Sequence, residues 1–330
     1  MRWLEMEKRI PEIVLLEPGS VWLDTDGRPI QAHGGSMLVH EGTYYWYGEN
    51  KGGESWLPEC NIAWDGYRVE AIGIHCYSSN DLIHWKNEGI VLSSVKGNSE
   101  HDLHTSKIIE RPRMLHNRRT GKFILWMHID TMDYLYARVG IAVSDSPVGP
   151  FAYIGSMRPD DCDSRDMTVF QDTDGKAYLL YSSAWNSELH ISQLDEDYLR
   201  PAGPMARAFV TNEKNQGPES PAVFKHDGCY FLITSRCTGW DPNPAEFSVA
   251  ESMMGPWKAM GNPCRGAGED TTFASQGSYV FEDANQAGVF IFMADRWKKT
   301  DLRDSRYVWL PIRIKDKTLT IEPPSSWQAG

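Results

Sequence analysis

Three acidic residues recur at the same place in a repeated sequence unit. Glu110, Asp166 and Glu219 each open a short apolar run, which is followed by a polar turn and a second run rich in aromatic and β-branched residues. Carboxyl groups gathered in one place raise one another's pKa, and partial burial raises it further. Such a cluster costs stability, which indicates that it has a use. Hydrolysis of a glycosidic bond uses it, because a protonated carboxyl donates to the leaving oxygen while a second group activates water.

The same unit occurs five times, since His33 and Gln276 open two further copies. In every copy the polar turn ends in a glycine, which is typical of a β-hairpin. These glycines are Gly42, Gly121, Gly175, Gly228 and Gly288. A hairpin that recurs in this way indicates the blades of a radial repeat. The sequence therefore predicts an all-β fold, a five-bladed β-propeller that forms one domain over residues 1–330.

The hairpin geometry predicts which side chains meet. In an antiparallel hairpin the start of the first strand lies beside the end of the second. The predicted neighbours are His33 with Glu49, Glu110 with His128 and Asp130, Asp166 with Trp185, Glu219 with Thr238 and Trp240, and Gln276 with Asp295 and Trp297. If the first strand of each blade is innermost, these open ends surround the propeller axis on one face. The alternative is an axis whose polar residues hold water or an ion and do no chemistry.

Composition narrows the possible partners. The net charge of -12 argues against nucleic acid and against an anionic membrane surface, because both attract clusters of Lys and Arg.

The six cysteines form no C-x-x-C pair, which favours free buried thiols over a disulfide framework. The first residues carry charges without a continuous apolar stretch, so we expect no signal peptide. The chain as written is predicted to be cytoplasmic, or secreted if a leader was removed. Its oligomeric state is not predicted.

The five units together resemble glycoside hydrolase family 43, and within it most closely the exo-β-1,3-galactanase group. The resemblance covers nearly the whole chain in the phrases AHGGSMLVHEGTYYWYGENK, ERPRMLHNRRTGKFILWMHID, SRDMTVFQDTDGKAYLLY, ESPAVFKHDGCYFLITSRCTGWDPN and SQGSYVF. Members of this family are five-bladed β-propellers that act by inversion. The resemblance thus implies an inverting, exo-acting hydrolase that releases galactose from β-1,3-galactan or arabinogalactan side chains.

The resemblance also implies roles for the residues that open the units. Glu219 in GPESPAVFK matches the general acid, and Asp166 in SRDM matches the carboxylate that raises the pKa of that acid and orients it. Most of the family places an aspartate base in the first blade, where this chain has His33. The galactanase group shares that departure and has a glutamine in the fifth blade, here Gln276. We expect Gln276 to position the attacking water, with a proton relayed through its imidic tautomer.

The resemblance implies that further residues bind the sugar. Glu110 in ERPR and Glu49 in YGENK match positions that hold the terminal sugar, and either could share the proton. Glu110 is therefore counted among the predicted catalytic residues. The remaining predicted substrate-binding residues are His33, Asp130, Trp185, Thr238 and Trp240. Trp56 and Trp64 lie in an insertion between Glu49 and Glu70, which either covers the pocket or packs on the propeller rim.

Two other functions stay open at this point. One is an α-L-arabinofuranosidase or β-xylosidase of the same family, which would share the acid and the modulating aspartate. The other is a non-catalytic glycan-binding propeller, for which the missing first-blade aspartate would be the lesion. The mechanism requires no metal or other cofactor, although a structural ion on the axis near His33 is left open. The expected partner is an oligosaccharide or polysaccharide.

Overall fold

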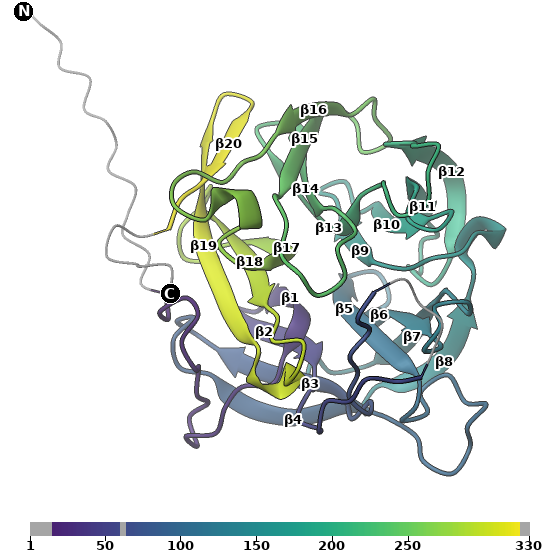
Figure 1. Ribbon diagram of the computed structural model, residues 1–330. Helices are drawn as coiled ribbons and strands as arrows, with labels where there is room; N and C mark the ends of the chain where they lie inside the picture. Colours follow the sequence, from purple (N-terminus) through teal and green to yellow (C-terminus); the bar gives the residue numbers. More distant parts are fainter. Residues whose placement is uncertain (1–14, 60–63, 324–330) are drawn as a thin grey trace, which may run out of the picture.

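A computed structural model describes residues 15–59 and 64–323 of the chain, and Figure 1 shows the arrangement of its strands. The described residues form five antiparallel sheets of four strands, and each sheet uses four consecutive strands. The first sheet contains β1 (His33–His40), β2 (Thr43–Glu49), β3 (Gly73–Ser79) and β4 (Lys86–Ser93). The second contains β5 (Ile108–Asn117), β6 (Lys122–Asp130), β7 (Arg138–Ser144) and β8 (Ala152–Met157).

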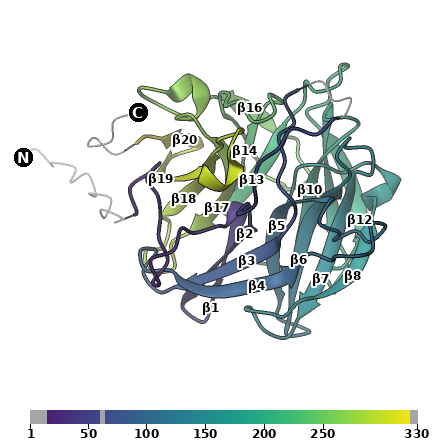
Figure 2. The ribbon, with the colours of Figure 1, turned by 60° about the horizontal axis from the view of Figure 1, so that its bottom comes forward.

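The other three sheets repeat this plan. The third contains β9 (Met167–Gln171), β10 (Ala177–Ser183), β11 (Glu188–Leu194) and β12 (Pro201–Ala208). The fourth contains β13 (Glu219–His226), β14 (Cys229–Ser235), β15 (Glu246–Ala250) and β16 (Lys258–Gly261). The fifth contains β17 (Gln276–Glu282), β18 (Phe290–Arg296), β19 (Arg306–Lys315) and β20 (Thr318–Ile321). Figure 2 shows the strands of the second sheet side by side.

The five sheets close into a ring. The first strands β1, β5, β9, β13 and β17 lie innermost, and each contacts the next around the axis, with β17 returning to β1 (Figure 1). The outermost strands β4, β8, β12, β16 and β20 lie at the rim (Figure 1). This arrangement confirms the predicted five-bladed β-propeller and its innermost first strands.

Aromatic packing seals the junction between the first and fifth blades. Trp22, which precedes β1, packs edge to face against Trp46 of the first blade and Trp309 of the fifth, with ring centroids 6.1 and 5.1 Å away. The backbone N–H of Gly19 also donates to the carbonyl oxygen of Tyr307 at 2.7 Å. No strand is shared between the first and fifth blades. The contacts of Trp22 and Gly19 therefore join the two ends of the ring.

Three of the innermost strands share a β-bulge directly after their opening residue. The strand register shifts at this place in β1, β5 and β13. The residue that follows the opening one is left-handed in each strand, with φ of 55° at Gly34, 52° at Arg111 and 52° at Ser220. A bulge bends the strand and changes the direction of its side chains. Two neighbouring residues of one strand can then face the same site.

Five of the six cysteines lie in the described ranges. Five cysteines are free thiols, as predicted, with Cys76 and Cys264 buried and Cys162, Cys229 and Cys237 half-buried. Cys60 and the predicted absence of a signal peptide in the first fourteen residues lie outside the described residues. The helical elements in the described ranges are three short 3-10 turns, and none could cross a membrane.

Candidate active site

The inner face of the ring holds a cavity of about 560 Å³. Residues from all five blades line it, and most of the predicted site residues are among them. Those on the wall are Glu49, Glu110, Asp166, Trp185, Glu219, Thr238, Trp240 and Gln276. The structure thus gathers all four residues predicted to be catalytic into one cavity.

Glu219 is equipped to hold a proton at neutral pH. It opens β13, and its Oε1 accepts a 2.6 Å hydrogen bond from the side-chain amide of Asn186. Burial, followed by the negative charge of Asp166, raises the pKa of Glu219 to about 8, against the opposing effects of the Cys237 thiol and the Arg111 charge. A carboxyl with this pKa can act as a general acid.

Asp166 is held by donors on both oxygens. The Arg111 Nε donates to Oδ1 at 3.0 Å, and its Nη2 donates to Oδ2 at 2.9 Å. The backbone N–H of Ser220 donates to Oδ2 at 2.9 Å. A carboxylate accepts such a bidentate, charge-assisted pair. Asp166 is therefore fixed as the negative charge beside Glu219.

The side-chain amide of Gln276 has its orientation set by donor chemistry. Its Oε1 accepts from Arg111 Nη2 at 2.7 Å and from Trp297 Nε1 at 3.1 Å, and its Nε2 contacts Ser235 Oγ at 3.1 Å. Arg and Trp side chains only donate, so the oxygen of the amide must face them. Gln276 is therefore held rigidly on the cavity wall.

Arg111 is a central residue that the sequence prediction missed. Its guanidinium joins Asp166 to Gln276, and its backbone N–H donates to Glu49 Oε1 at 3.0 Å. In a regular strand, the residue after Glu110 would point to the opposite side. The bulge at left-handed Arg111 cancels this alternation. The only signal in the sequence was its place in the phrase ERPR, one residue after an opening acid.

Glu110 differs from Glu219 in its electrostatics. The prediction that the clustered acids raise one another's pKa is wrong for Glu110: burial raises its pKa, but His128, whose Nδ1 lies 3.6 Å from Oε2, and the charge of Lys51 outweigh burial and lower it to about 2. Lys51 also pairs with Glu49 at 2.6 Å. Burial nevertheless raises the pKa of Glu49, because Lys51 offsets it only in part and Glu110 adds to it. Glu110 thus suits accepting hydrogen bonds from sugar hydroxyls.

Two predicted substrate-binding residues lie behind the cavity wall. His33 is fully buried, with Nδ1 3.1 Å from Asp295 and its ring stacked on Tyr307. Asp130 is also fully buried and lies 2.9 Å from His128 Nε2. Neither lines the cavity, so their placement does not support direct contact with a sugar. Asp130 acts on His128: although burial lowers the pKa of His128, Asp130 and Glu110 raise it to about 9.

A metal site can be tested against the same residues. Ligand atoms of Glu110, His128 and Asp166 lie within 4.8 Å of one another. Arg111 already donates to both oxygens of Asp166, and His128 faces Glu110 as a cation. A metal ion would need a neutral imidazole and free carboxylate oxygens. These three residues fit an ion-pair network better than a metal centre.

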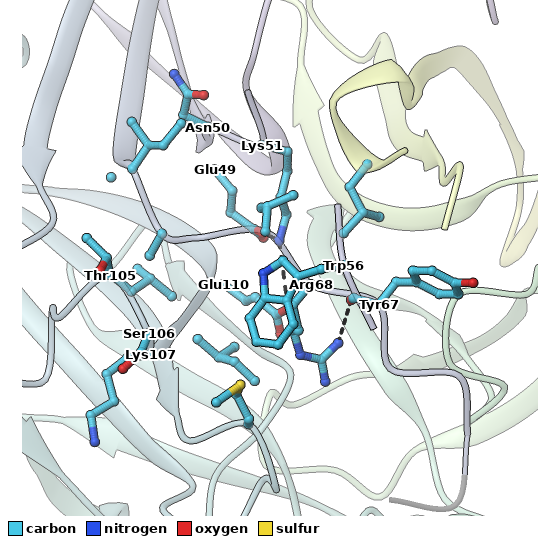
Figure 3. Close-up of a pocket in the computed structure, with 18 of the residues that line it drawn as sticks. Glu49, Asn50, Lys51, Trp56, Tyr67, Arg68, Thr105, Ser106, Lys107 and Glu110 are labelled. Atoms are coloured by element: carbon cyan, nitrogen blue, oxygen red, sulfur yellow. Dashed lines mark hydrogen bonds and ion pairs between the residues drawn. The ribbon is translucent and has the colours of Figure 1, made fainter. Parts of the chain in front are cut away.

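The insertion between β2 and β3 covers one side of the cavity. Trp56 and Arg68 form an antiparallel bridge within it, and both line the small pocket drawn in Figure 3, as does Glu110. The Arg68 guanidinium lies 4.9 Å from the ring centroids of Trp64 and Tyr134. Trp64 lines the main cavity, whereas Trp56 lines a smaller neighbouring one of about 30 Å³. The insertion therefore contributes an aromatic wall to the site.

Comparisons with known proteins agree with this architecture. The family model described as "Glycosyl hydrolases family 43" matches residues 28–304. A solved GH43 β-1,3-galactosidase with galactodeoxynojirimycin is 39% identical with a TM-score of 0.84, over 94% of this chain and 99% of that one. The exo-β-1,3-galactanase from Phanerochaete chrysosporium, solved with galactose, is 34% identical with a TM-score of 0.80, over 93% of this chain and 66% of that one.

Two further relatives broaden the comparison. The exo-β-1,3-galactanase from Clostridium thermocellum is 35% identical with a TM-score of 0.79, over 94% of this chain and 65% of that one. A curated protein from Butyrivibrio fibrisolvens named "Xylosidase/arabinosidase" is 26% identical over 176 residues, which is 50% of this chain. The chain spans 32% of that relative's length. With the family model matched along most of its length, the chain belongs to glycosyl hydrolases family 43.

Proposed function

We propose that the chain is an inverting, exo-acting glycoside hydrolase that releases terminal galactose from β-1,3-galactan or arabinogalactan side chains. The observation that carries the proposal is the pair formed by Glu219 and Asp166: one half-buried carboxyl with a raised pKa beside a second that is fixed by Arg111. The choice of galactose rests on the similarity to β-1,3-galactosidase and exo-β-1,3-galactanase structures.

In the proposed reaction the proton of Glu219 moves to the glycosidic oxygen as the bond from that oxygen to C1 breaks. Asp166 remains an anion and keeps the pKa of Glu219 high until the proton has left. Water attacks C1 from the opposite face, which inverts the configuration. Gln276 holds this water through its Nε2–H, since its Oε1 is occupied by Arg111 and Trp297.

The proton lost by the water has two available acceptors. Gln276 could relay it through an imidic tautomer, but this tautomer places a hydrogen on Oε1, which already faces the donors of Arg111 and Trp297. Glu49 lies on the same wall, and burial raises its pKa. A carboxylate with a raised pKa is the better base. We therefore assign proton acceptance to Glu49, and positioning of the water to Gln276.

The remaining wall suits a sugar ring. Trp240 and Trp297 pack against each other with centroids 5.1 Å apart, and both line the cavity. An indole face suits the apolar face of a galactose ring. Glu110 is the acceptor for its hydroxyl groups. No step of this mechanism uses a metal ion.

The proposal is tested by measuring galactose release from β-1,3-galactobiose. The native chain should act on it, and Glu219→Gln should lower the rate by at least about 10²-fold, because a general acid contributes that much. Glu246→Gln, which alters an exposed carboxyl of the same blade, should leave the rate unchanged. A native rate that does not exceed that of Glu219→Gln would leave only a glycan-binding propeller.

A second candidate function follows from the Butyrivibrio relative. Its name indicates release of xylose or arabinose, and an enzyme of that kind would use the same pair of acids. Arabinofuranosides and xylosides with nitrophenyl leaving groups should therefore be assayed beside galactobiose. A rate on either that exceeds the rate on galactobiose would replace galactose as the substrate while keeping the mechanism.

A further inference from the structure

The turn between β10 and β11 has an unusual backbone. Three consecutive residues that are not glycine adopt the left-handed conformation: Ala184 with φ of 51°, Trp185 with φ of 58° and Asn186 with φ of 52°. L-residues with a Cβ rarely adopt it, and runs of them persist only where the surroundings impose them. Asn186, the third of these residues, is the donor to the Glu219 carboxyl.

One carboxylate supports this turn. Asp163 lies in the loop between β8 and β9, and its Oδ1 accepts from the Ala184 backbone N–H at 2.9 Å and from Ser183 Oγ at 3.0 Å. Its Oδ2 accepts from the Trp185 backbone N–H at 3.2 Å. Arg165 pairs with the same carboxylate. Asp163 therefore holds two successive N–H groups of the left-handed run.

The far side of the turn is tied to the strand that carries the acid. The backbone oxygen of Asn186 accepts from Gly217 N–H at 2.7 Å, and the oxygen of Trp185 accepts from Asn215 N–H at 2.8 Å. Both donors lie in the segment that leads directly into β13, which opens with Glu219. The turn is thus fixed from one side by Asp163 and joined on the other to the acid's own strand.

We propose that Asp163 is a positioning residue for the general acid: it fixes the left-handed turn so that Asn186 holds Glu219 Oε1 and leaves the transferable proton on Oε2. The proposal rests on the proposed role of Glu219 as the acid. Because Asn186 Nδ2–H donates to Oε1, that oxygen is an acceptor. The proton then resides on Oε2 and moves to the glycosidic oxygen as the bond to C1 breaks. Asp163 touches no substrate in this account and acts only through the turn.

The test compares two substrates that differ in their need for the acid. β-1,3-Galactobiose has a sugar alkoxide leaving group that must be protonated, whereas β-galactosyl fluoride releases fluoride with little need for it. Asp163→Asn can no longer accept on both oxygens, and a small displacement of a catalytic group costs up to about 10²-fold. We expect kcat/KM on galactobiose to fall about 10- to 100-fold, with less than about 3-fold loss on the fluoride.

The ratio of the two rates does not depend on the fraction of folded enzyme, so a partly folded variant still gives an answer. Asp172→Asn is the matched control, because Asp172 is a buried aspartate at the other end of the same blade, where it pairs with Lys225. Its ratio should equal that of the native chain. Adding Ala184→Gly to Asp163→Asn should raise the ratio of kcat/KM on galactobiose to kcat/KM on the fluoride at least about 3-fold, because glycine adopts the left-handed conformation freely.

Each outcome separates this inference from the proposed function. If Glu219→Gln changes the ratio and Asp163→Asn lowers both rates equally or neither, Asp163 has only a structural role and the proposal is wrong. If Glu219→Gln itself leaves the ratio unchanged, the proposed acid is wrong. If Asp163→Asn selectively loses activity on galactobiose and Ala184→Gly restores it, the positioning role stands.

Discussion

Two half-buried glutamates of the site differ in proton affinity, and the difference lies in their neighbours. Glu219 has the negative Asp166 beside it, so burial and that charge together raise its pKa to about 8. Glu110 has the cations His128 and Lys51 beside it, and they lower its pKa to about 2 in spite of burial. Counting acids in the sequence therefore identifies the cluster but not the role of each acid. The roles depend on cations that other strands bring in.

The pH profile should report the two groups assigned to proton transfer. Glu219 must be protonated, so kcat/KM on galactobiose should fall as the pH rises through about 8. Glu49 must be ionised, so kcat/KM should also fall as the pH is lowered through the pKa of Glu49. Burial raises this pKa, so the fall should begin at a higher pH than for an ordinary carboxyl group. Glu49→Gln should remove the acid limb from the residual activity. An alkaline limb that persists in Glu219→Gln would mean that another group donates the proton.

Gln276 and Glu49 should contribute to turnover in different ways. Gln276→Ala removes the group that positions water and should lower kcat by about 10²- to 10³-fold, which is typical for loss of a preorganised donor. Glu49→Gln should lower kcat by about 10²- to 10⁴-fold, as for loss of a general base. Steady-state kinetics on galactobiose distinguish them. Near-native kcat in Gln276→Ala would refute its role, and a change confined to KM in Glu49→Gln would refute the assigned base.

Strands of the repeated unit position the site through their bulges. The hairpin pattern correctly predicts that His33 pairs with Glu49, Glu110 with His128, and Gln276 with Asp295. It does not predict Arg111, because strict alternation turns the residue after an opening one away from the site. The position of a bulge depends on the fit between neighbouring blades, which a single sequence pattern does not contain.

Gly34 tests the importance of a bulge in the first blade. Its φ is +55°, and a Cβ added there would lie 2.2 Å from Glu49 Oε1. Gly34→Ala should therefore displace Glu49, lower kcat at least about 10-fold, and cost about 1–2 kcal/mol of unfolding free energy from the left-handed backbone alone.

Gly42→Ala is the control for that variant. Gly42 also has a left-handed φ of +78°, but nothing lies within 4 Å of an added Cβ. The Gly42→Ala variant should lose a similar unfolding free energy, about 1–2 kcal/mol, because its alanine is also left-handed, and it should keep native kcat. Equal kcat in the two variants would show that the clash with Glu49 is unimportant.

At the scale of the molecule, the repeat specifies the propeller, because each hairpin is a local unit with its own turn glycine. Closure of the ring is less local. Trp22 reaches across to Trp46 and Trp309, far apart in the sequence, and nothing in the repeated unit marks it for that role. The site likewise depends on contacts between blades, which explains why the ring of polar openings was predictable and the placement of His33 and Asp130 behind the wall was not.

The acid should reduce the stability of the whole molecule. With its pKa raised to about 8, Glu219 stays protonated in the folded chain at pH 7, while the unfolded chain ionises it. This linkage costs folding free energy increasingly as the pH rises from the unfolded pKa toward 8. Glu219→Gln should therefore raise the unfolding free energy at pH 7 by on the order of 2 kcal/mol, and by little at pH 4. Denaturant unfolding at the two pH values measures it, and a variant less stable at pH 7 would contradict it.

The configuration of the first product tests the central claim most directly. Proton NMR during hydrolysis of β-1,3-galactotriose by the native chain records which anomer of galactose appears before mutarotation. Attack by water opposite the bond that Glu219 protonates predicts α-galactose, released one unit at a time with galactobiose as the other early product. First formation of β-galactose would show retention and a covalent intermediate, and would contradict the mechanism built on Glu219, Asp166 and Gln276.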